Sequence, residues 1–389
     1  MSSALFAYGF RPFFLAVGLS AVALVPWWAG SFAFGVPLGT GWPPTLWHAH
    51  EMLFGFIIAA AAGFLLTAVP SWTGQRGFAG WPLVGLTALW LLGRLGVGSA
   101  RFWPLAAVAA ADLAFLPALA VLVAQPLLRS RNRNTPLLGV IFLLWACDAA
   151  FYWSLAAFDS ARAAGALRVG IDLMLILVTV IGGRIVPAFT SSGLKARGDA
   201  TALGSWPAIT PITIGLMIAV ALVDLVRPDG ALSGAVALAA GVAQAVRMLQ
   251  WRTLRTLRTP IVWVLHLAYA WLPVGLLLKA AALLGGTGLA AFWIHALTIG
   301  ALSTMILAVM TRAALGHTGR PLVAAPSIAV AYGLLTAAAV VRVFGLAWWP
   351  ERYPGIIVLS ALLWTGAFAT FLVVYGPILW SPRVDGRPG

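Results

Sequence analysis

The chain has 389 residues, of which 62% are hydrophobic and only 9% are charged, and its mean hydropathy is +0.98. This composition excludes a soluble globular protein and is typical of a polytopic membrane protein. The formal net charge of +14 does not indicate a nucleic-acid partner, because the basic residues lie in short gaps between apolar runs. The single cysteine, Cys147, excludes an intrachain disulfide and a thiolate metal cage.

Apolar runs divide the chain into segments that are each long enough to cross a bilayer core, which needs about 20 helical residues. Turn residues and charges mark the boundaries, and the first run is too long for a cleaved signal sequence. The sequence predicts an all-α bundle of about 12 transmembrane helices, forming a single integral-membrane domain over residues 1–389 in the lipid bilayer. The predicted helices span 10–33, 46–70, 81–99, 104–126, 135–157, 167–188, 207–226, 231–250, 260–284, 290–312, 322–346 and 354–377.

The positions of Lys and Arg predict the orientation of this bundle. Basic residues gather in every second connection, as in the run that holds Arg129, Arg131 and Arg133, whereas the alternate connections hold few. Cytoplasmic loops of membrane proteins carry such an excess. We therefore expect both termini on the cytoplasmic side.

The second predicted helix opens with the sequence WHAHEM at 47–52, which places two of the five histidines beside a glutamate. Ionisable groups in a membrane span mark candidate functional sites, and imidazole is the commonest metal ligand. Residues two apart on an α-helix point about 200° apart, so His48 and His50 cannot both face one metal if the helix is regular there. His48, Glu51 and Met52 share one face through their spacing, and His50 shares its face with Phe54.

The predicted orientation places His295 at the same depth as the two histidines of the second helix, close to the outer face. His266 lies nearer the cytoplasmic side, and His317 follows in a loop region. Metal or cofactor binding is the interpretation that we favour for the outer histidines together with Glu51. A histidine at a helix end can also cap the helix or bond a carbonyl, and a role in shaping a turn is favoured for His317.

Other charged residues fall within the predicted spans and can form structural ion pairs. The functional alternative is a proton route or an anchor for acidic groups of a cofactor, and Asp148 is the most deeply placed carboxylate. Arg184 either extends to the cytoplasmic face or holds a cofactor carboxylate through its bidentate fork. The set comprises Arg94, Asp112, Asp148, Asp172, Arg184, Asp224, Lys279 and Arg342.

Several long motifs occur in order along nearly the whole chain. They are GFRPFF at 9–14, WHAHEMLFGF at 47–56, GFLLTAVP at 63–70, GRIVPAFT at 183–190, HALT at 295–298 and GHTGRP at 316–321. Together these motifs resemble the NnrS family. The resemblance implies a bacterial inner-membrane protein of twelve helices that contains haem and copper and is associated with denitrification and with tolerance to nitric oxide and nitrosative stress.

With haem b as the cofactor that the resemblance implies, histidine is a natural axial ligand. We predict that His48 or His50 pairs with His295 on one iron. The remaining histidine of the second helix, with Glu51 and Met52, could offer a copper site, because imidazole and thioether both suit copper. His266, together with His317, is the next candidate, for a haem edge nearer the inner leaflet.

Two other functions stay open at the level of sequence. One is a membrane oxidoreductase that consumes nitric oxide, although five histidines are too few for the ligand set of a full haem–copper oxidase or nitric oxide reductase. The other is a secondary transporter without a redox cofactor, in which helix breaks such as Pro70 and Pro187 and the membrane charges would bind substrate. The oligomeric state does not follow from the sequence.

Overall fold

The computed structural model describes residues 4–286, 288 and 292–387, and within them the chain forms helices and turns but no strand. Twelve of its helices are long and apolar enough to cross a membrane, which confirms the predicted helical fold and helix count. The side of the membrane on which the termini lie stays a prediction. The spans are Phe10–Phe34, Pro44–Thr73, Trp81–Gly98, Leu105–Arg129, Leu137–Ala156, Ser160–Lys195, Ile209–Val226, Ala231–Trp251, Pro260–Gly285, Trp293–His317, Pro326–Trp348 and Pro350–Trp380.

The largest difference from the predicted boundaries concerns the sixth span. It begins at Ser160 and ends at Lys195, whereas hydropathy predicts 167–188. The helix continues beyond the apolar segment into charged residues at both ends, because the length of an α-helix is not limited by the thickness of the bilayer. Asp159 starts this helix by accepting a hydrogen bond from the backbone N of Arg162 at 2.9 Å. The predicted start of the tenth helix at residue 290 lies outside the described residues.

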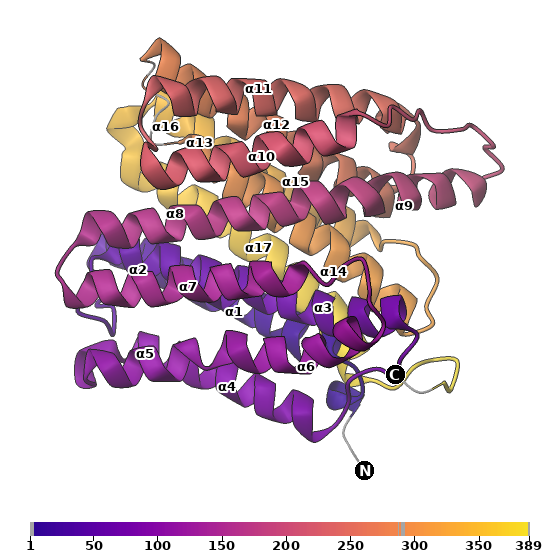
Figure 1. Cartoon of the computed structure of the whole chain (residues 1–389), viewed down its shortest axis with the longest axis horizontal. Coiled ribbons are helices and arrows are strands. Elements are labelled where there is room, and N and C mark those ends of the chain that lie inside the picture. Colours follow the sequence, from indigo (N-terminus) through magenta and orange to yellow (C-terminus); the bar gives the residue numbers. More distant parts are fainter. Residues whose placement is uncertain (1–3, 287, 289–291, 388–389) are drawn as a thin grey trace. The chain divides into compact units, whose positions relative to one another are not determined.

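The chain forms two compact units, and each is described by itself. The first comprises Met1–Gly170, Ala313–Pro321 and Phe368–Gly389, and the second comprises Ile171–Arg312 and Leu322–Ala367. The single domain over 1–389 that we expect from composition stays a prediction beside this division. In Figure 1 the first unit is drawn mainly in indigo to magenta and the second mainly in magenta to orange.

The first unit contains the first five spans (Figure 1). Its third span, α4, packs against both α5 and α6. The second span is one continuous helix made of α2, the π-helix η2 and α3. The elements are η1 (Ala4–Phe6), α1 (Phe10–Phe34), α2 (Pro44–His50), η2 (Glu51–Ile57), α3 (Ile58–Thr73), α4 (Trp81–Gly98), η3 (Ala100–Phe102), α5 (Leu105–Leu113), α6 (Phe115–Arg129), α7 (Leu137–Ala156) and the start of α8 (Ser160–Leu177).

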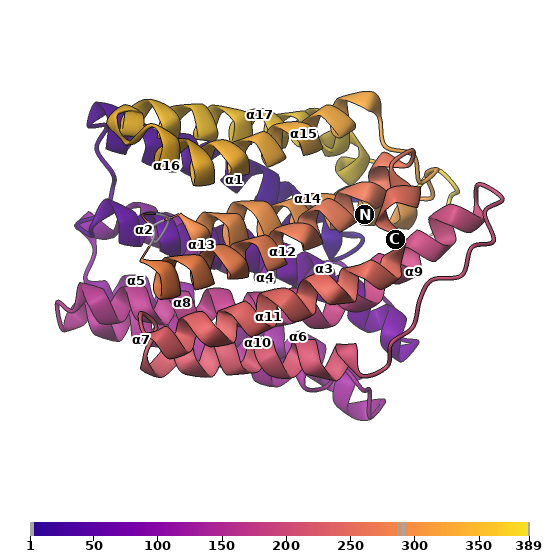
Figure 2. The ribbon, with the colours of Figure 1, turned by 90° about the horizontal axis from the view of Figure 1, so that it is seen from above.

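In the second unit α10, α11 and α12 run side by side (Figure 2), and α11 and α12 share the most extensive contact. Small residues permit this approach, because a Cβ on Gly241 would lie 3.0 Å from the side chain of Leu277. The elements are η4 (Val178–Gly182), α9 (Gly183–Lys195), α10 (Ile209–Val226), α11 (Ala231–Met248), η5 (Leu249–Trp251), η6 (Thr253–Thr256), α12 (Pro260–Gly285), α13 (Trp293–His295), η7 (Ala296–Ser303), α14 (Thr304–His317), α15 (Pro326–Val340), η8 (Val341–Gly345), α16 (Leu346–Trp348), η9 (Pro350–Arg352) and α17 (Tyr353–Trp380); α14 and α17 end in the first unit.

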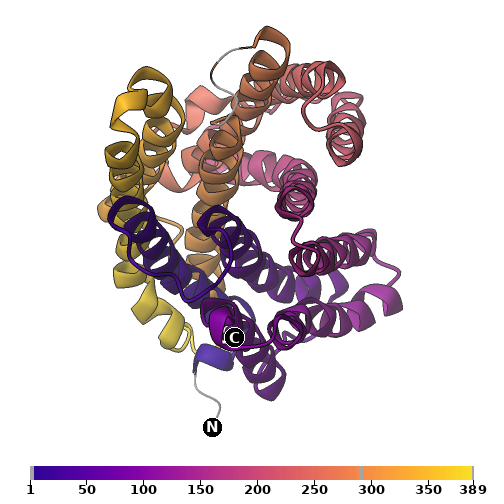
Figure 3. The same cartoon turned by 90° about the vertical axis from the view of Figure 1, so that its left-hand side faces the viewer.

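Arg11, in the GFRPFF motif, joins the start of α1 to the end of α17 inside the first unit, whose helices are seen nearly end-on in Figure 3. Its side chain is fully buried and donates to the carbonyls of Leu379 at 3.0 Å and Ser381 at 2.6 Å. The last carbonyls of a helix lack partners within the helix, and a cation there is favoured by the helix dipole. The motif therefore has a structural role in holding the two ends of the chain together.

In the part of the chain that the structure describes, four membrane spans contain a π-helical segment: η2, η4, η7 and η8. A wider turn leaves a backbone carbonyl without its usual partner, and side chains supply the missing donor in this protein. Trp90 Nε1 donates to Gly55 O in η2 at 3.1 Å, and Arg247 Nη1 donates to Thr179 O in η4 at 2.8 Å. Such segments are frequent at functional sites, and η2 directly follows His50.

Candidate metal centre

The two histidines of the second span contact different helices. His48 stacks on Trp28 of α1, with ring centroids 4.1 Å apart and planes inclined by 19°. His50 is fully buried and packs against Phe54 at 5.1 Å and Phe151 of α7 at 4.6 Å. The helix begins at Pro44, ahead of both residues, so the near-opposite directions of positions two apart on a helix determine which neighbour each ring meets.

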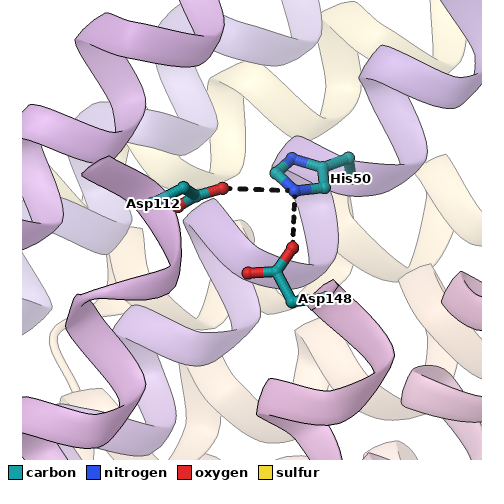
Figure 4. Close-up of side chains that lie close together, drawn as sticks. All are labelled: His50, Asp112 and Asp148. Carbon is teal, nitrogen blue, oxygen red and sulfur yellow. Dashed lines mark hydrogen bonds and ion pairs between the residues drawn. The ribbon is translucent and has the colours of Figure 1, made fainter. Parts of the chain in front are cut away.

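His50 lies among carboxylates from three helices. Its Nε2 is 3.0 Å from Asp148 Oδ1 of α7 and 3.2 Å from Asp112 Oδ2 of α5 (Figure 4), and its Nδ1 is 3.3 Å from Glu51 Oε1. Each of these three carboxylate side chains is at most 4% exposed. Both ring nitrogens are therefore held in place by acidic groups inside an apolar unit.

Arg94 of α4 and Tyr152 of α7 complete this group. The Arg94 guanidinium forms ion pairs with Glu51 and with Asp112. Tyr152 donates its hydroxyl hydrogen to Asp112 Oδ2 at 2.8 Å. We refer to His50, Glu51, Arg94, Asp112, Asp148 and Tyr152 as the His50 cluster.

Two glycines leave room for the charged side chains of the His50 cluster. A Cβ on Gly93 would lie 2.7 Å from Asp112 Oδ1, which is closer than real Cβ contacts come. A Cβ on Gly55 would lie 3.2 Å from Arg94 Cδ and 3.4 Å from Glu51 Oε2. Any larger residue at position 93 would therefore push Asp112 away from Arg94.

The His50 cluster contains more acidic than basic groups. It holds three carboxylates, whereas Arg94 and a protonated His50 together supply only two positive charges, so at least one negative charge remains. A buried carboxylate without a compensating charge is costly. The cluster therefore favours a further cation, which can be a proton or a metal ion.

The geometry also suits a metal ion. His50, Asp112 and Asp148 each offer one ligand atom, and these atoms all lie within 4.8 Å of one another. Metal–ligand bonds of about 2.0–2.2 Å place neighbouring ligand atoms roughly 3 Å apart, as Nε2 is from each carboxylate oxygen. One imidazole with two carboxylates suits Cu(II), Zn²⁺ or iron better than Cu(I), which prefers sulfur ligands. Among the described residues this is the one such group of histidine, cysteine and acidic side chains.

The family described as NnrS protein matches residues 4–383 of the chain. The chain belongs to the NnrS family. This finding confirms the resemblance carried by the sequence motifs, and the helices show a polytopic membrane fold. No curated protein matches the chain.

The remaining histidines of this NnrS-family protein have other surroundings. His266 lies in the second unit, where Thr190 Oγ1 is 2.7 Å from its Nε2 and Thr253 Oγ1 is 3.0 Å from its Nδ1. His317 ends α14 and packs against the rings of Tyr8 at 5.8 Å and Phe10 at 5.7 Å. Hydroxyl groups therefore lie within hydrogen-bonding distance of both ring nitrogens of His266, and aromatic rings pack against the imidazole of His317.

His295 is half-buried at the end of α13, directly before the π-helix η7, and it belongs to the second unit. Its pairing with His48 or His50 on one iron stays a prediction, because those residues belong to the first unit. Arg184 lies on the exposed side of α9. Cofactor binding by Arg184, His266 or His317 likewise stays a prediction.

The sequence named most of the His50 cluster but did not assemble it. The sequence predicts Arg94, Asp112 and Asp148 as membrane charges that can pair, and Arg94 does pair with Asp112 and Glu51. Nothing in the local sequence marked Tyr152, since a tyrosine in an apolar span has many other roles. Asp112, Asp148 and Tyr152 all lie in apolar spans, and the local sequence does not indicate which of their side chains contact one another.

Proposed function

We propose that this NnrS-family protein is a metal-containing protein of the bacterial inner membrane that acts in tolerance to nitric oxide and nitrosative stress during denitrification. Family membership supports the biological setting. The observation that carries the metal assignment is the buried His50 with its two carboxylate neighbours, because nothing else in the described residues gathers three such ligands.

Copper is the ion that we assign to His50, Asp112 and Asp148. A nitrogen and oxygen donor set suits Cu(II). The carboxylate oxygens lie 3.0 and 3.2 Å from His50 Nε2, which matches the spacing of neighbouring ligand atoms around one metal ion. His48, which the sequence predicts as an alternative copper ligand with Glu51 and Met52, does not belong to this group. Glu51 would then serve as the neighbour that bonds Nδ1 of His50 and orients the ring.

Haem b fits His50 less well than a bare ion does. Nε2 of His50 points to two carboxylates, whereas an axial ligand needs its nitrogen directed at the iron of a large flat ring. We therefore propose His295, in the second unit, as an axial ligand of the haem.

A copper ion at this site would supply a one-electron centre that can bind nitric oxide. The protein's own residues then have separate tasks. Arg94 and Tyr152 fix Asp112, the ring of Phe151 covers His50 and keeps water away, and Asp148 Oδ1 can hold a proton with His50 Nε2 whenever no metal is bound.

Metal analysis and an optical spectrum of the purified full-length protein test this proposal. We expect about one copper per chain, and we expect Asp148→Asn and His50→Ala each to lower the copper content severalfold. Asp159→Asn is the matched control, because that residue is a half-exposed aspartate at the start of α8. Unchanged copper in both site variants would refute the assignment. A Soret band that His295→Ala leaves unaltered would refute the haem ligand.

A nitric oxide-consuming oxidoreductase is the second candidate. It is favoured by the proximity of acid groups to the proposed metal, because reduction of nitric oxide consumes protons as well as electrons. Purified protein supplied with an electron donor should then remove nitric oxide in an electrode chamber, and Asp148→Asn should slow that removal. A colourless, metal-free preparation would instead favour a secondary transporter without a redox cofactor.

A further inference from the structure

Arg247 is a buried cation in the second unit and belongs to no part of the proposed metal site. It lies in the last turn of α11, and only 2% of its surface is exposed. The membrane span of which it is part ends four residues later, at Trp251. The charge is therefore inside the protein but close to the end of a span, on the side that the orientation predicts to be cytoplasmic.

Within the described residues, Arg247 donates hydrogen bonds to uncharged groups. Nη1 donates to Thr179 O at 2.8 Å and to the hydroxyl of Tyr269 at 3.1 Å. Nη2 donates to Thr210 Oγ1 at 3.4 Å, which is long for a hydrogen bond. Thr210 is exposed, so the weakly bonded end of the guanidinium is one side chain away from the surface of the unit.

A second layer of neutral groups fixes the direction of these bonds. Tyr269 donates to Gln244 Oε1 at 2.6 Å, and Gln244 Nε2 donates to Thr179 Oγ1 at 3.0 Å. Thr179 in turn donates to the carbonyl of Leu175 at 2.9 Å. Tyr269, Gln244 and Thr179 are fully buried, and none of them can neutralise the guanidinium.

No carboxylate of the described chain pairs with Arg247, and in this it differs from two other buried cations. Arg94 pairs with Glu51 and Asp112, and Lys279 pairs with Asp224. A buried unpaired charge within a membrane span is costly, and such residues are functional-site candidates. The absence of a counter-charge at Arg247 is therefore the observation that points to an anionic ligand.

The backbone beneath Arg247 is shaped to hold its guanidinium. A Cβ on Gly183 would lie 2.1 Å from Nη2 and 2.5 Å from Nη1, so any larger residue there would require the guanidinium to move. The preceding π-helix η4 supplies the Thr179 carbonyl that accepts from Nη1. The ring of Trp251 lies 5.8 Å from the guanidinium carbon, which adds a cation–π contact. Gly183, in the motif Gly183-Arg184-Ile185-Val186, therefore lets the guanidinium of Arg247 from α11 pack closely against the backbone of α9.

We propose that Arg247 binds a small planar oxyanion, of the shape of a carboxylate or nitrite. A guanidinium presents a planar fork that matches such anions with two parallel bonds. The anion would add the negative charge that the site lacks and would replace the long bond from Nη2. Its source is either a free anion or the carboxylate of a molecule with an apolar tail. The inference does not depend on the metal proposed at His50.

Calorimetric titration of the full-length protein in detergent, in chloride-free buffer, tests the proposal with formate as the probe. We expect saturable binding with a dissociation constant on the order of 1 mM. Arg247→Gln should abolish it. Arg247→Lys, which keeps the charge but loses the fork, should weaken it by about tenfold. Gly183→Ala, which displaces the guanidinium without removing it, should also weaken it.

Arg312→Gln is the matched control, because Arg312 is another buried arginine of the second unit that pairs with no carboxylate of the described chain, but its guanidinium stacks on Phe189 at 4.1 Å. This variant should bind formate as the wild type does; weakened binding would show that a buried arginine without a counter-charge binds the anion wherever it lies. A parallel titration with octanoate distinguishes the sources: tighter binding that depends on Arg247 indicates a tailed carboxylate, and equal or weaker binding indicates a free anion. The proposal is overturned if the wild type shows no saturable binding, if Arg247→Lys and Arg247→Gln bind unchanged, or if chloride binds as tightly as formate.

Discussion

Nε2 of His50 lies 3.0 Å from Oδ1 of Asp148, although 98 positions separate the two residues in the chain. The contact joins α2 to α7, and the side chains are 0% and 3% exposed. A buried charge is stable only when a partner accompanies it, so each member of the His50 cluster depends on the others. The cluster should therefore respond to substitution as one unit.

Arg94→Ala provides the first test of that dependence. It would leave Glu51 and Asp112 buried without their main counter-charge, and the loss of one partner from a buried pair costs about 3–5 kcal/mol. Arg162→Ala is the control, since its ion pair with Asp159 is exposed and is worth about 1 kcal/mol or less. The free energy of unfolding, measured by detergent titration with far-UV circular dichroism, should fall much further for the first variant. Equal losses would show that the cluster is not coupled.

Trp90→Phe addresses the π-helix that follows His50. The substitution keeps the aromatic ring but removes the donor to Gly55 O, which leaves a buried carbonyl unsatisfied at a cost of about 1–3 kcal/mol. Trp81→Phe is the control, because Trp81 is 84% exposed. We expect a lower unfolding free energy for Trp90→Phe alone. If both variants unfold alike, η2 does not need the bond from Trp90.

The fold could be predicted from the sequence because a bilayer imposes a minimum length on every apolar helix. Twelve apolar runs in the sequence reach that length, and the described residues contain twelve helices that could span a membrane. The π-helices could not be predicted, since the extra residue in a π-turn changes neither composition nor hydropathy. η2, for example, is an unbroken apolar stretch after Glu51. The division into two compact units also has no signal in a chain that lacks long linkers.

The site could be predicted in part. Helical geometry indicated that His48 and His50 point apart, but not which of them would meet acidic groups. That choice depends on which helices lie beside the second span, and the order of helices around one another is not written in hydropathy. The packing of α5 against α7 brings Asp112 and Tyr152 together, and this contact could not be predicted from the sequence.

Asp199, in the loop after α9, should make stability depend on pH. The backbone N and the hydroxyl of Thr201 donate to it, as does Arg255 Nη1 at 3.0 Å, and these bonds lower the pKa of Asp199 to about 2. An unfolded aspartate has a pKa of about 3.9. The ionised carboxylate therefore stabilises the fold above about pH 4, and this contribution disappears as the pH falls toward 2.

The measurement for Asp199 is the difference in melting temperature between the wild type and Asp199→Asn. It should be constant above about pH 4 and shrink as the pH is lowered toward 2. A difference that grows on acidification would have the wrong sign and would exclude a lowered pKa in the folded state.

Lys279 and Asp224 form a buried ion pair within the membrane spans. A double-mutant cycle shows whether its role is structural. Lys279 is 1% exposed and lies over the ring of Trp293 at 5.0 Å, while Asp224 also accepts from Ser233 Oγ at 2.6 Å. Lys279→Met alone leaves the Asp224 carboxylate buried without its counter-charge and should lower the free energy of unfolding by about 3–5 kcal/mol. Adding Asp224→Asn, which keeps an acceptor for Ser233, removes that charge and should recover most of the loss.

Unfolding free energies of the four proteins give the coupling energy. A double variant as unstable as the sum of the two single variants would mean that Lys279 and Asp224 act separately. Strong coupling would instead distinguish this self-neutralised pair from Arg247, whose charge no residue of the described chain balances.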